Sequence, residues 1–194
     1  FSGMAEIIKC AMIADLDFFE FLENESDAIK ARDPIIFEKV MRRTIRIKEA
    51  HVHGDVQERG KRLFLNFGHT LGHAIEMASQ NESEEALRHG EGVALGMISI
   101  VQICQKYLNL DASVLKRLES ILKCYELPTT FSSSSIGWNS SDLIKRCLDL
   151  VQKDKKRKKG AVRLVYLDKI GDAFVTSNTS EEMLLHGFNS ILSP

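Results

Sequence analysis

The chain has 194 residues, of which 44% are hydrophobic and 27% charged, and these proportions are ordinary for a folded globular protein. Its 26 Lys and Arg residues nearly balance its 27 Asp and Glu residues, so the net charge of −1 argues against a nucleic-acid-binding or membrane-surface protein. The longest apolar stretch, 93–104, contains polar residues and is shorter than the roughly 20 residues that cross a bilayer.

Helical periodicity dominates the first half of the chain. The apolar residues of 4–15 recur at helical spacing, and the aromatic residues of 18–22 indicate a second, short helix. Asp33 followed by Pro34 is typical of an N-cap and a first helical residue, which predicts a helix from Pro34 past Lys48. The polar segment 54–60 is predicted to be a loop.

The next helices surround the chain's least polar segment. A helix is expected to resume near Gly68 and to fade in the polar run 79–85. The segment 91–107 is apolar almost all round, which predicts a central, buried helix. Further helices fit 112–125 and 141–151.

The C-terminal region combines strand and helix signals. The β-prone segments 162–167 and 173–176 flank Gly171, which predicts a hairpin. Thr179 and Glu182 match a capping box that opens a last helix. The predicted fold class is therefore mostly α, a multi-helix domain with a small β-hairpin near the C-terminus.

Two features bear on compartment and completeness. The four cysteines lie far apart and form no Cys-x-x-Cys pair, which indicates reduced thiols and predicts a cytoplasmic protein. A helical pattern begins directly after Phe1, with no strand or cap before it. We therefore expect the chain to be part of a longer protein.

The segment from Asn66 to Glu76 carries the densest candidate chemistry. His69 and His73 are four residues apart, so they share one face of a helix, and His89 opens the next helix. Neutral imidazole is the commonest protein ligand of zinc, and an open zinc site needs three protein ligands. The pattern supports two interpretations, a metal-centred active site or histidines with a structural role only.

The start of this first histidine helix has a second feature. Gly68 and Gly72 are predicted to clear the approach to it, and Asn66 adds an amide donor. Unpaired backbone N–H groups at such a start suit an anionic ligand.

Charged residues form the remaining candidates. Glu6 and Lys9 share a face of the first helix, where a surface ion pair would contribute about 0–1 kcal/mol. That helix is apolar around them, and a buried charge needs a partner such as a metal. The basic residues Lys48, Arg62 and 153–159 fit a solvated face or, alternatively, a rim that binds phosphate and carboxylate groups.

Taken together, these segments resemble the 3-dehydroquinate synthase family. The matching segments occur in family order: 3–9, the region of Lys48, 55–62, 65–76, 89–97 and 154–156. The resemblance covers the family's C-terminal, helical half. It implies that residues 1–194 form a metal- and substrate-binding domain and that the N-terminal NAD-binding domain is absent from this chain.

The resemblance also implies a set of site residues. It assigns a divalent metal, Zn²⁺ with Co²⁺ as the alternative, to Glu6, His69 and His89, whereas the local pattern alone would make His73 a ligand. It implies catalytic roles for His73, Lys9 and Lys155. The implied substrate-binding residues are Lys9, Lys48, Arg62, Asn66, His73, Lys155 and Lys156. The NAD-binding residues are expected mainly in the absent half.

The implied activity is conversion of 3-deoxy-D-arabino-heptulosonate 7-phosphate into 3-dehydroquinate and phosphate. This lyase reaction uses NAD and a metal and belongs to the shikimate pathway of chorismate and aromatic amino acid biosynthesis. The implied partners are the sugar phosphate and the N-terminal domain, and the resemblance also allows a homodimer of the intact enzyme. Alternatives are another sugar-phosphate cyclase, a metal-dependent polyol dehydrogenase of the same scaffold and a non-enzymatic metal-binding domain. The chain alone is expected to be inactive.

Overall fold

The computed structural model describes residues 2–57, 60–79, 87–132, 139–157 and 162–193, with the backbone alone at 154–157 and 193. The helices are α1 (Ser2–Ala14), α2 (Leu16–Asn24), α3 (Ser26–Lys30), α4 (Pro34–Val52), α5 (His69–Ser79), α6 (His89–Leu108), α7 (Ala112–Cys124), α8 (Ser140–Arg157) and α9 (Glu181–Ile191), and η1 (Lys61–Asn66) is a 3-10 helix. Strands β1 (Phe131–Ser132) and β4 (Leu192–Ser193) pair in parallel, whereas β2 (Leu164–Lys169) and β3 (Asp172–Thr176) form an antiparallel hairpin.

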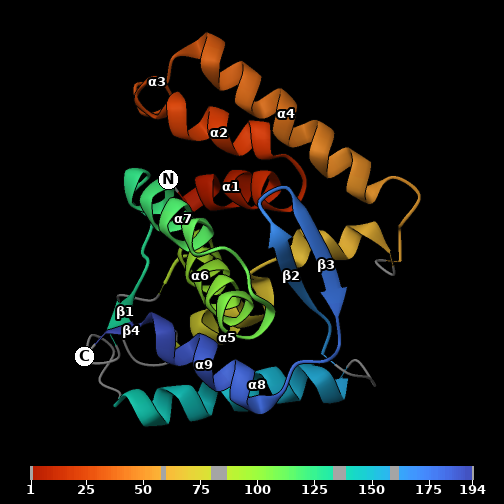
Figure 1. Ribbon diagram of the computed structural model, residues 1–194, viewed down its shortest axis with the longest axis vertical. Helices are drawn as coiled ribbons and strands as arrows, with labels where there is room; N and C mark the ends of the chain where they lie inside the picture. The colour runs from red at the N-terminus through yellow and green to blue at the C-terminus, as the bar shows by residue number, and fades with distance from the viewer. Residues whose placement is uncertain (1, 58–59, 80–86, 133–138, 158–161, 194) are drawn as a thin grey trace.

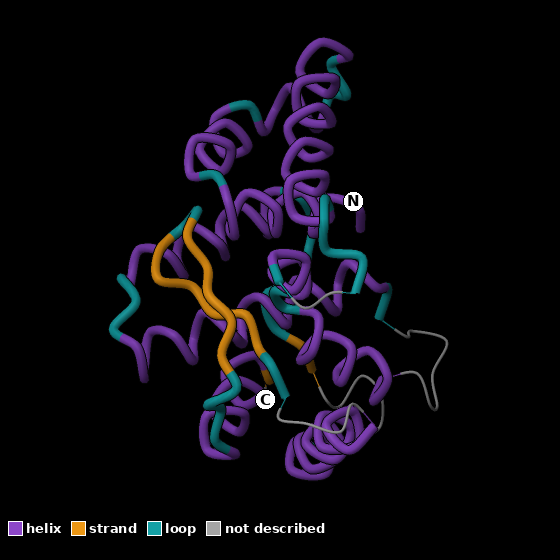
Figure 2. Tube along the Cα trace, turned by 90° about the vertical axis from the view of Figure 1, so that its right-hand side faces the viewer, coloured by secondary structure: helices purple, strands orange, loops and turns teal. Residues whose placement is uncertain are grey.

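Helix α6 is the centre of the molecule. Helices α1 to α4 gather at one end and α8 and α9 at the other, with α5 and α6 between them (Figure 1). Helix α6 contacts α1, α5, α7, α9 and β2, and most of its residues from Gly90 to Cys104 are buried. The hairpin of β2 and β3 lies along one side of the helices (Figure 2). The prediction of a central, buried helix is confirmed, because every side of α6 meets another element.

Helices α5 and α6 cross with their backbones in direct contact. A Cβ atom at Gly96 would overlap the carbonyl oxygen of Gly68, and one at Gly72 would lie 2.5 Å from the carbonyl oxygen of Gly92. Gly68 also has φ +75°, in the left-handed region that favours glycine. The backbone of α6 therefore fills the space beside Gly68 and Gly72. The prediction that these glycines clear a ligand's approach is wrong.

The first turns of α1 and α6 also touch. The backbone N–H of Gly90 donates to the hydroxyl oxygen of Ser2 at 3.0 Å, and Gly90 has no room for a side chain because the backbone of Ser2 lies against it. This contact brings the start of α6, which carries His89, to the helix that carries Glu6.

The predicted fold class is confirmed, with differences at short elements. Asp33 caps α4 by accepting from the N–H groups of Ile35 and Ile36, as the sequence predicted. The helix predicted over 141–151 continues to Arg157. Helices α3 and η1 and the pair of β1 with β4 were not predicted, because such short elements carry no periodicity of their own.

The predicted capping box of the last helix is wrong. Ser180, not Thr179, caps α9 by accepting from the N–H of Met183. The hydroxyl of Thr179 instead pairs with that of Tyr166 on β2, at 2.9 Å. A buried phenol needs a hydrogen-bond partner, and this tertiary contact takes the hydroxyl that the local pattern assigned to the helix.

Among the described residues, no helix is long and apolar enough to cross a membrane.

The crossing of α5 and α6 predicts opposite effects of Gly→Ala substitution at two positions. Gly96→Ala should lower the free energy of unfolding by about 1–3 kcal/mol or more, because its Cβ meets backbone that cannot move aside. Gly3→Ala is the control: it lies in α1, its Cβ meets nothing within 4 Å, and it should raise stability by about 0.5–1 kcal/mol. Urea unfolding followed by circular dichroism measures both, and equal stabilities would contradict the close crossing.

Two buried thiols predict loss of stability at alkaline pH. Burial raises the pKa of Cys104 and of Cys147 to about 12, from an ordinary value of 9.0. Above pH 9 the unfolded chain loses these protons while the folded chain keeps them, so stability should fall as pH rises from about 9 to about 12. The expected slope is up to about 1.4 kcal/mol per pH unit and thiol.

Urea midpoints at pH 8 and pH 10.5 measure this alkaline effect. In Cys147→Ala the fall between the two pH values should be smaller than in the unsubstituted chain. An equal fall in both would contradict a role for this thiol.

Candidate metal and substrate site

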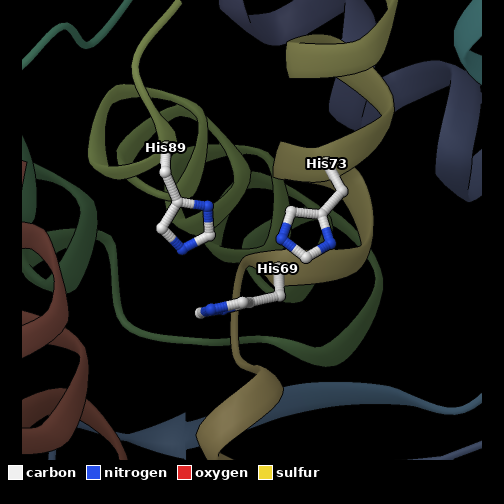
Figure 3. Close-up of side chains that lie close together, drawn as sticks. All are labelled: His69, His73 and His89. Atoms are coloured by element: carbon white, nitrogen blue, oxygen red, sulfur yellow. The ribbon is translucent and has the colours of Figure 1, made fainter.

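Three imidazoles converge between α5 and the start of α6. His69 and His73 lie one turn apart on α5, and His89 is the first residue of α6. Each pair of ring centroids is 5.3 Å apart, and one ligand atom from each residue lies within 4.8 Å of the others. All three side chains extend into the same space (Figure 3). Such a group of nitrogen atoms can close on a single divalent cation after small side-chain movements.

Glu6 joins this cluster through His69. The Oε1 atom of Glu6 lies 3.3 Å from Nε2 of His69. The Nζ atom of Lys9 donates to both Glu6 oxygens, at 2.8 and 2.9 Å, and Nζ of Lys48 donates to Oε2 at 3.3 Å. Lys9 is only 2% exposed, so Glu6 and Lys9 do not form an ordinary surface ion pair. The structure thus brings a carboxylate, two ammonium groups and an imidazole to one point.

The electrostatics keep this carboxylate charged. Burial by itself would raise the pKa of Glu6, but hydrogen bonds from His69 and Lys9 and the charge of Lys9 hold that pKa well below its ordinary value of 4.5. Burial lowers the pKa of Lys9 from 10.5, and the charge and hydrogen bonds of Glu6 oppose the shift. Glu6 is therefore an anion at neutral pH, which a metal ligand has to be.

Both ring nitrogens of His69 face atoms that accept hydrogen bonds. Its Nδ1 atom is 3.3 Å from the carbonyl oxygen of Phe67, and its Nε2 atom faces Glu6. A neutral imidazole carries one N–H and one lone pair, so it cannot donate to both acceptors. Either a second ring proton or a metal ion between Nε2 and Glu6 satisfies this arrangement.

The other predicted site residues differ in position. Lys48, on α4, reaches Glu6, and His73 is exposed beside His69 and His89. Arg62 binds the preceding loop, with its backbone N–H donating to Asp55 and its guanidinium donating to the carbonyl oxygen of Val56 at 3.3 Å. Asn66 is partly buried at the end of η1. The side chains of Lys155 and Lys156 lie outside the described residues.

One charged residue of the site had no predicted role. The Oε2 atom of Glu76 lies 3.3 Å from Nδ1 of His89, across the contact between α5 and α6. The signal that could have identified it is spacing, because His69, His73 and Glu76 follow one another at four and three residues and so share a face of α5.

Solved structures identify the class of fold. The chain superposes on 2-epi-5-epi-valiolone synthase from Streptomyces hygroscopicus subsp. jinggangensis, solved with NAD⁺ and Zn²⁺ bound, with a TM-score of 0.82 and 21% sequence identity. The match covers 98% of this chain and 50% of that synthase. With 2-deoxy-scyllo-inosose synthase, solved with carbaglucose-6-phosphate, NAD⁺ and Co²⁺, the TM-score is 0.73 at 21% identity, covering 98% and 51%. The fold is thus shared with half of each of these synthases.

Sequence comparison identifies the family. The family model described as "3-dehydroquinate synthase C-terminal" matches residues 3–157. The 3-dehydroquinate synthases of Hydrogenovibrio crunogenus and Haemophilus ducreyi are each 36% identical to the chain, over 94% and 95% of it and 48% of each relative. The chain therefore belongs to the 3-dehydroquinate synthase family. It spans about half the length of these relatives, and the resemblance seen in the sequence is confirmed.

Proposed function

We propose that this chain is the metal- and substrate-binding part of a 3-dehydroquinate synthase. The intact protein converts 3-deoxy-D-arabino-heptulosonate 7-phosphate into 3-dehydroquinate and phosphate, and an N-terminal domain outside this chain binds NAD. The observation that carries the proposal is the meeting of anionic Glu6, buried Lys9, Lys48 and three histidines in a chain of this family. The names of the relatives support the same reaction.

The donor set fits a borderline metal such as Zn²⁺ or Co²⁺. We assign the metal to Glu6, His69 and His89, because an anion beside His69 attracts a dication more strongly than a neutral imidazole does. The arrangement of Nε2 of His69 against Glu6 is satisfied by that ion. Exposed His73 is then left to contact the substrate. Two synthases of the same fold, one solved with Zn²⁺ and one with Co²⁺, support this choice of metals.

The chain's own residues bind and orient the substrate. A metal held by Glu6, His69 and His89 would supply Lewis acidity at the substrate hydroxyl group that is to be oxidised. Lys9, Lys48 and Arg62 provide cationic donors for the phosphate and carboxylate groups, so that the leaving phosphate departs from a neutralised position. Asn66 adds an amide donor.

Proton transfer falls to other side chains. His73 holds or moves a proton near the leaving phosphate, because an imidazole exchanges protons at neutral pH. Lys155 and Lys156 complete the proposed substrate contacts. Among them we assign catalytic roles to His73, Lys9 and Lys155.

A second candidate is another sugar-phosphate cyclase. The fold likeness to 2-deoxy-scyllo-inosose synthase favours it, whereas the family match and the 36% identical relatives favour the first candidate. A polyol dehydrogenase of the same scaffold has less need of two lysines around the partly buried carboxylate of Glu6.

The metal assignment predicts the zinc content of variants of the intact parent protein. Unsubstituted protein should hold about one zinc per chain, and His69→Ala and His89→Ala should each lose it, because an open site cannot spare one of three protein ligands. His186→Ala, on α9 beside Tyr107, is the control and should keep the zinc. Mass-spectrometric metal analysis measures the content, and full occupancy in His69→Ala or His89→Ala would contradict the ligand set.

The proposed reaction predicts activity in the intact parent protein and none in residues 1–194. The parent should release phosphate from 3-deoxy-D-arabino-heptulosonate 7-phosphate, whereas the chain alone lacks the domain that binds NAD, the oxidant of the substrate. A phosphate-release assay with this substrate and with glucose 6-phosphate separates the two cyclase candidates. Turnover of glucose 6-phosphate alone would favour the second, and activity of the isolated chain would contradict the division of roles.

A further inference from the structure

Glu76 lies beside the proposed metal ligands, but no step described so far uses it. Its side chain is 18% exposed, and its Oε2 atom is 3.3 Å from Nδ1 of His89. It projects from the same face of α5 as His69 and His73. This carboxylate therefore meets the one proposed ligand that α6 supplies.

The close crossing of α5 and α6 creates this contact. A Cβ atom at Gly92 would lie 3.4 Å from Cβ of Glu76 and 3.1 Å from the carbonyl oxygen of Gly72. Only this short separation between the helices lets Glu76 reach His89 one turn before Gly92. The side chain of His89 is 48% exposed, so packing alone constrains its ring little. The carboxylate provides the directional contact that the packing lacks.

We propose that Glu76 is a positioning residue that holds His89 with its proton on Nδ1, so that the lone pair of Nε2 is free for the metal. The inference rests on the proposed metal site. An ionised carboxylate accepts hydrogen bonds and donates none, so a bond between Oε2 of Glu76 and Nδ1 of His89 requires Nδ1–H. A neutral imidazole then carries its lone pair on Nε2.

The Nδ1 atom of His69, like that of His89, faces a hydrogen-bond acceptor, but the acceptor is a different group. The carbonyl oxygen of Phe67 lies 3.3 Å from Nδ1 of His69, which directs Nε2 of that ring toward Glu6. Histidines that bind metals commonly donate their second ring N–H to a carboxylate or a backbone carbonyl, which fixes the ring and makes the ligand more basic. Both proposed histidine ligands thus have an acceptor at Nδ1, and Glu76 is the charged one.

The test compares two substitutions of Glu76 with a matched control. Glu76→Ala removes the acceptor, whereas Glu76→Gln removes the charge but keeps a carbonyl oxygen at the same place. Glu91→Gln is the control, because it makes the same charge change in the first turn of α6, where Glu91 accepts from the backbone N–H of Arg88 at 2.7 Å. Urea unfolding confirms that each variant is folded.

The first measurement is the tautomer of His89 in the metal-free 194-residue chain. Ring ¹⁵N chemical shifts, recorded at a pH where the ring is neutral, should show Nδ1–H in the unsubstituted chain, in Glu76→Gln and in Glu91→Gln. In Glu76→Ala they should move toward Nε2–H. An unchanged tautomer in Glu76→Ala would overturn the proposal.

The second measurement is zinc affinity of the intact parent protein, by competition with a chromogenic chelator. Glu76→Ala should raise the dissociation constant by about 10–100-fold, Glu76→Gln by less, and Glu91→Gln should leave it unchanged. If the parent binds zinc equally well with and without Glu76, the positioning role of Glu76 is overturned, but the proposed metal site is not. An unsubstituted parent that binds no zinc would overturn the proposed metal site itself.

Discussion

Backbone contact between α5 and α6 is the constraint on which the site depends. A side chain at Gly72 or Gly96 would separate the two helices, because the partner backbone already fills that space, and a Cβ atom at Gly92 would lie only 3.1 Å from the carbonyl oxygen of Gly72. At this separation His69, His73 and Glu76 on one helix reach His89 on the other. The glycines therefore set how far apart the candidate ligands on the two helices lie.

Charge placement around Glu6 follows a second constraint. Lys9 is almost fully buried, and an ammonium group in that position requires an anion within hydrogen-bonding distance. Glu6 meets this requirement and also faces His69 and Lys48, so one carboxylate links the fold of α1 to the chemistry of the site. Removing Glu6 would leave the buried Lys9 ammonium without its anion and His69 without its carboxylate partner, so the same residue serves both the packing of α1 and the candidate site.

Local patterns in the sequence predicted most of the helices, because amphipathic periodicity and the Asp33 cap act within a few residues. These local patterns gave wrong predictions where a residue makes a tertiary contact instead of the local contact that its pattern suggested. The hydroxyl of Thr179 pairs with Tyr166, so Ser180 became the cap of α9. Gly68 and Gly72 were predicted to admit a ligand, but they admit α6. Helices α3 and η1 and the pair of β1 with β4 were missed because two to six residues carry too little periodicity.

By itself, the sequence determined the fold class, the family and the residue types that can bind a metal, because these depend on composition, spacing and matched motifs. It could not determine which groups face one another. That Glu6 on α1 meets His69 on α5, and that Glu76 reaches His89, was decided by the tertiary structure. The reason is physical: these pairs are separated by many residues, and only the packing of α1, α5 and α6 through glycine contacts fixes distances between helices.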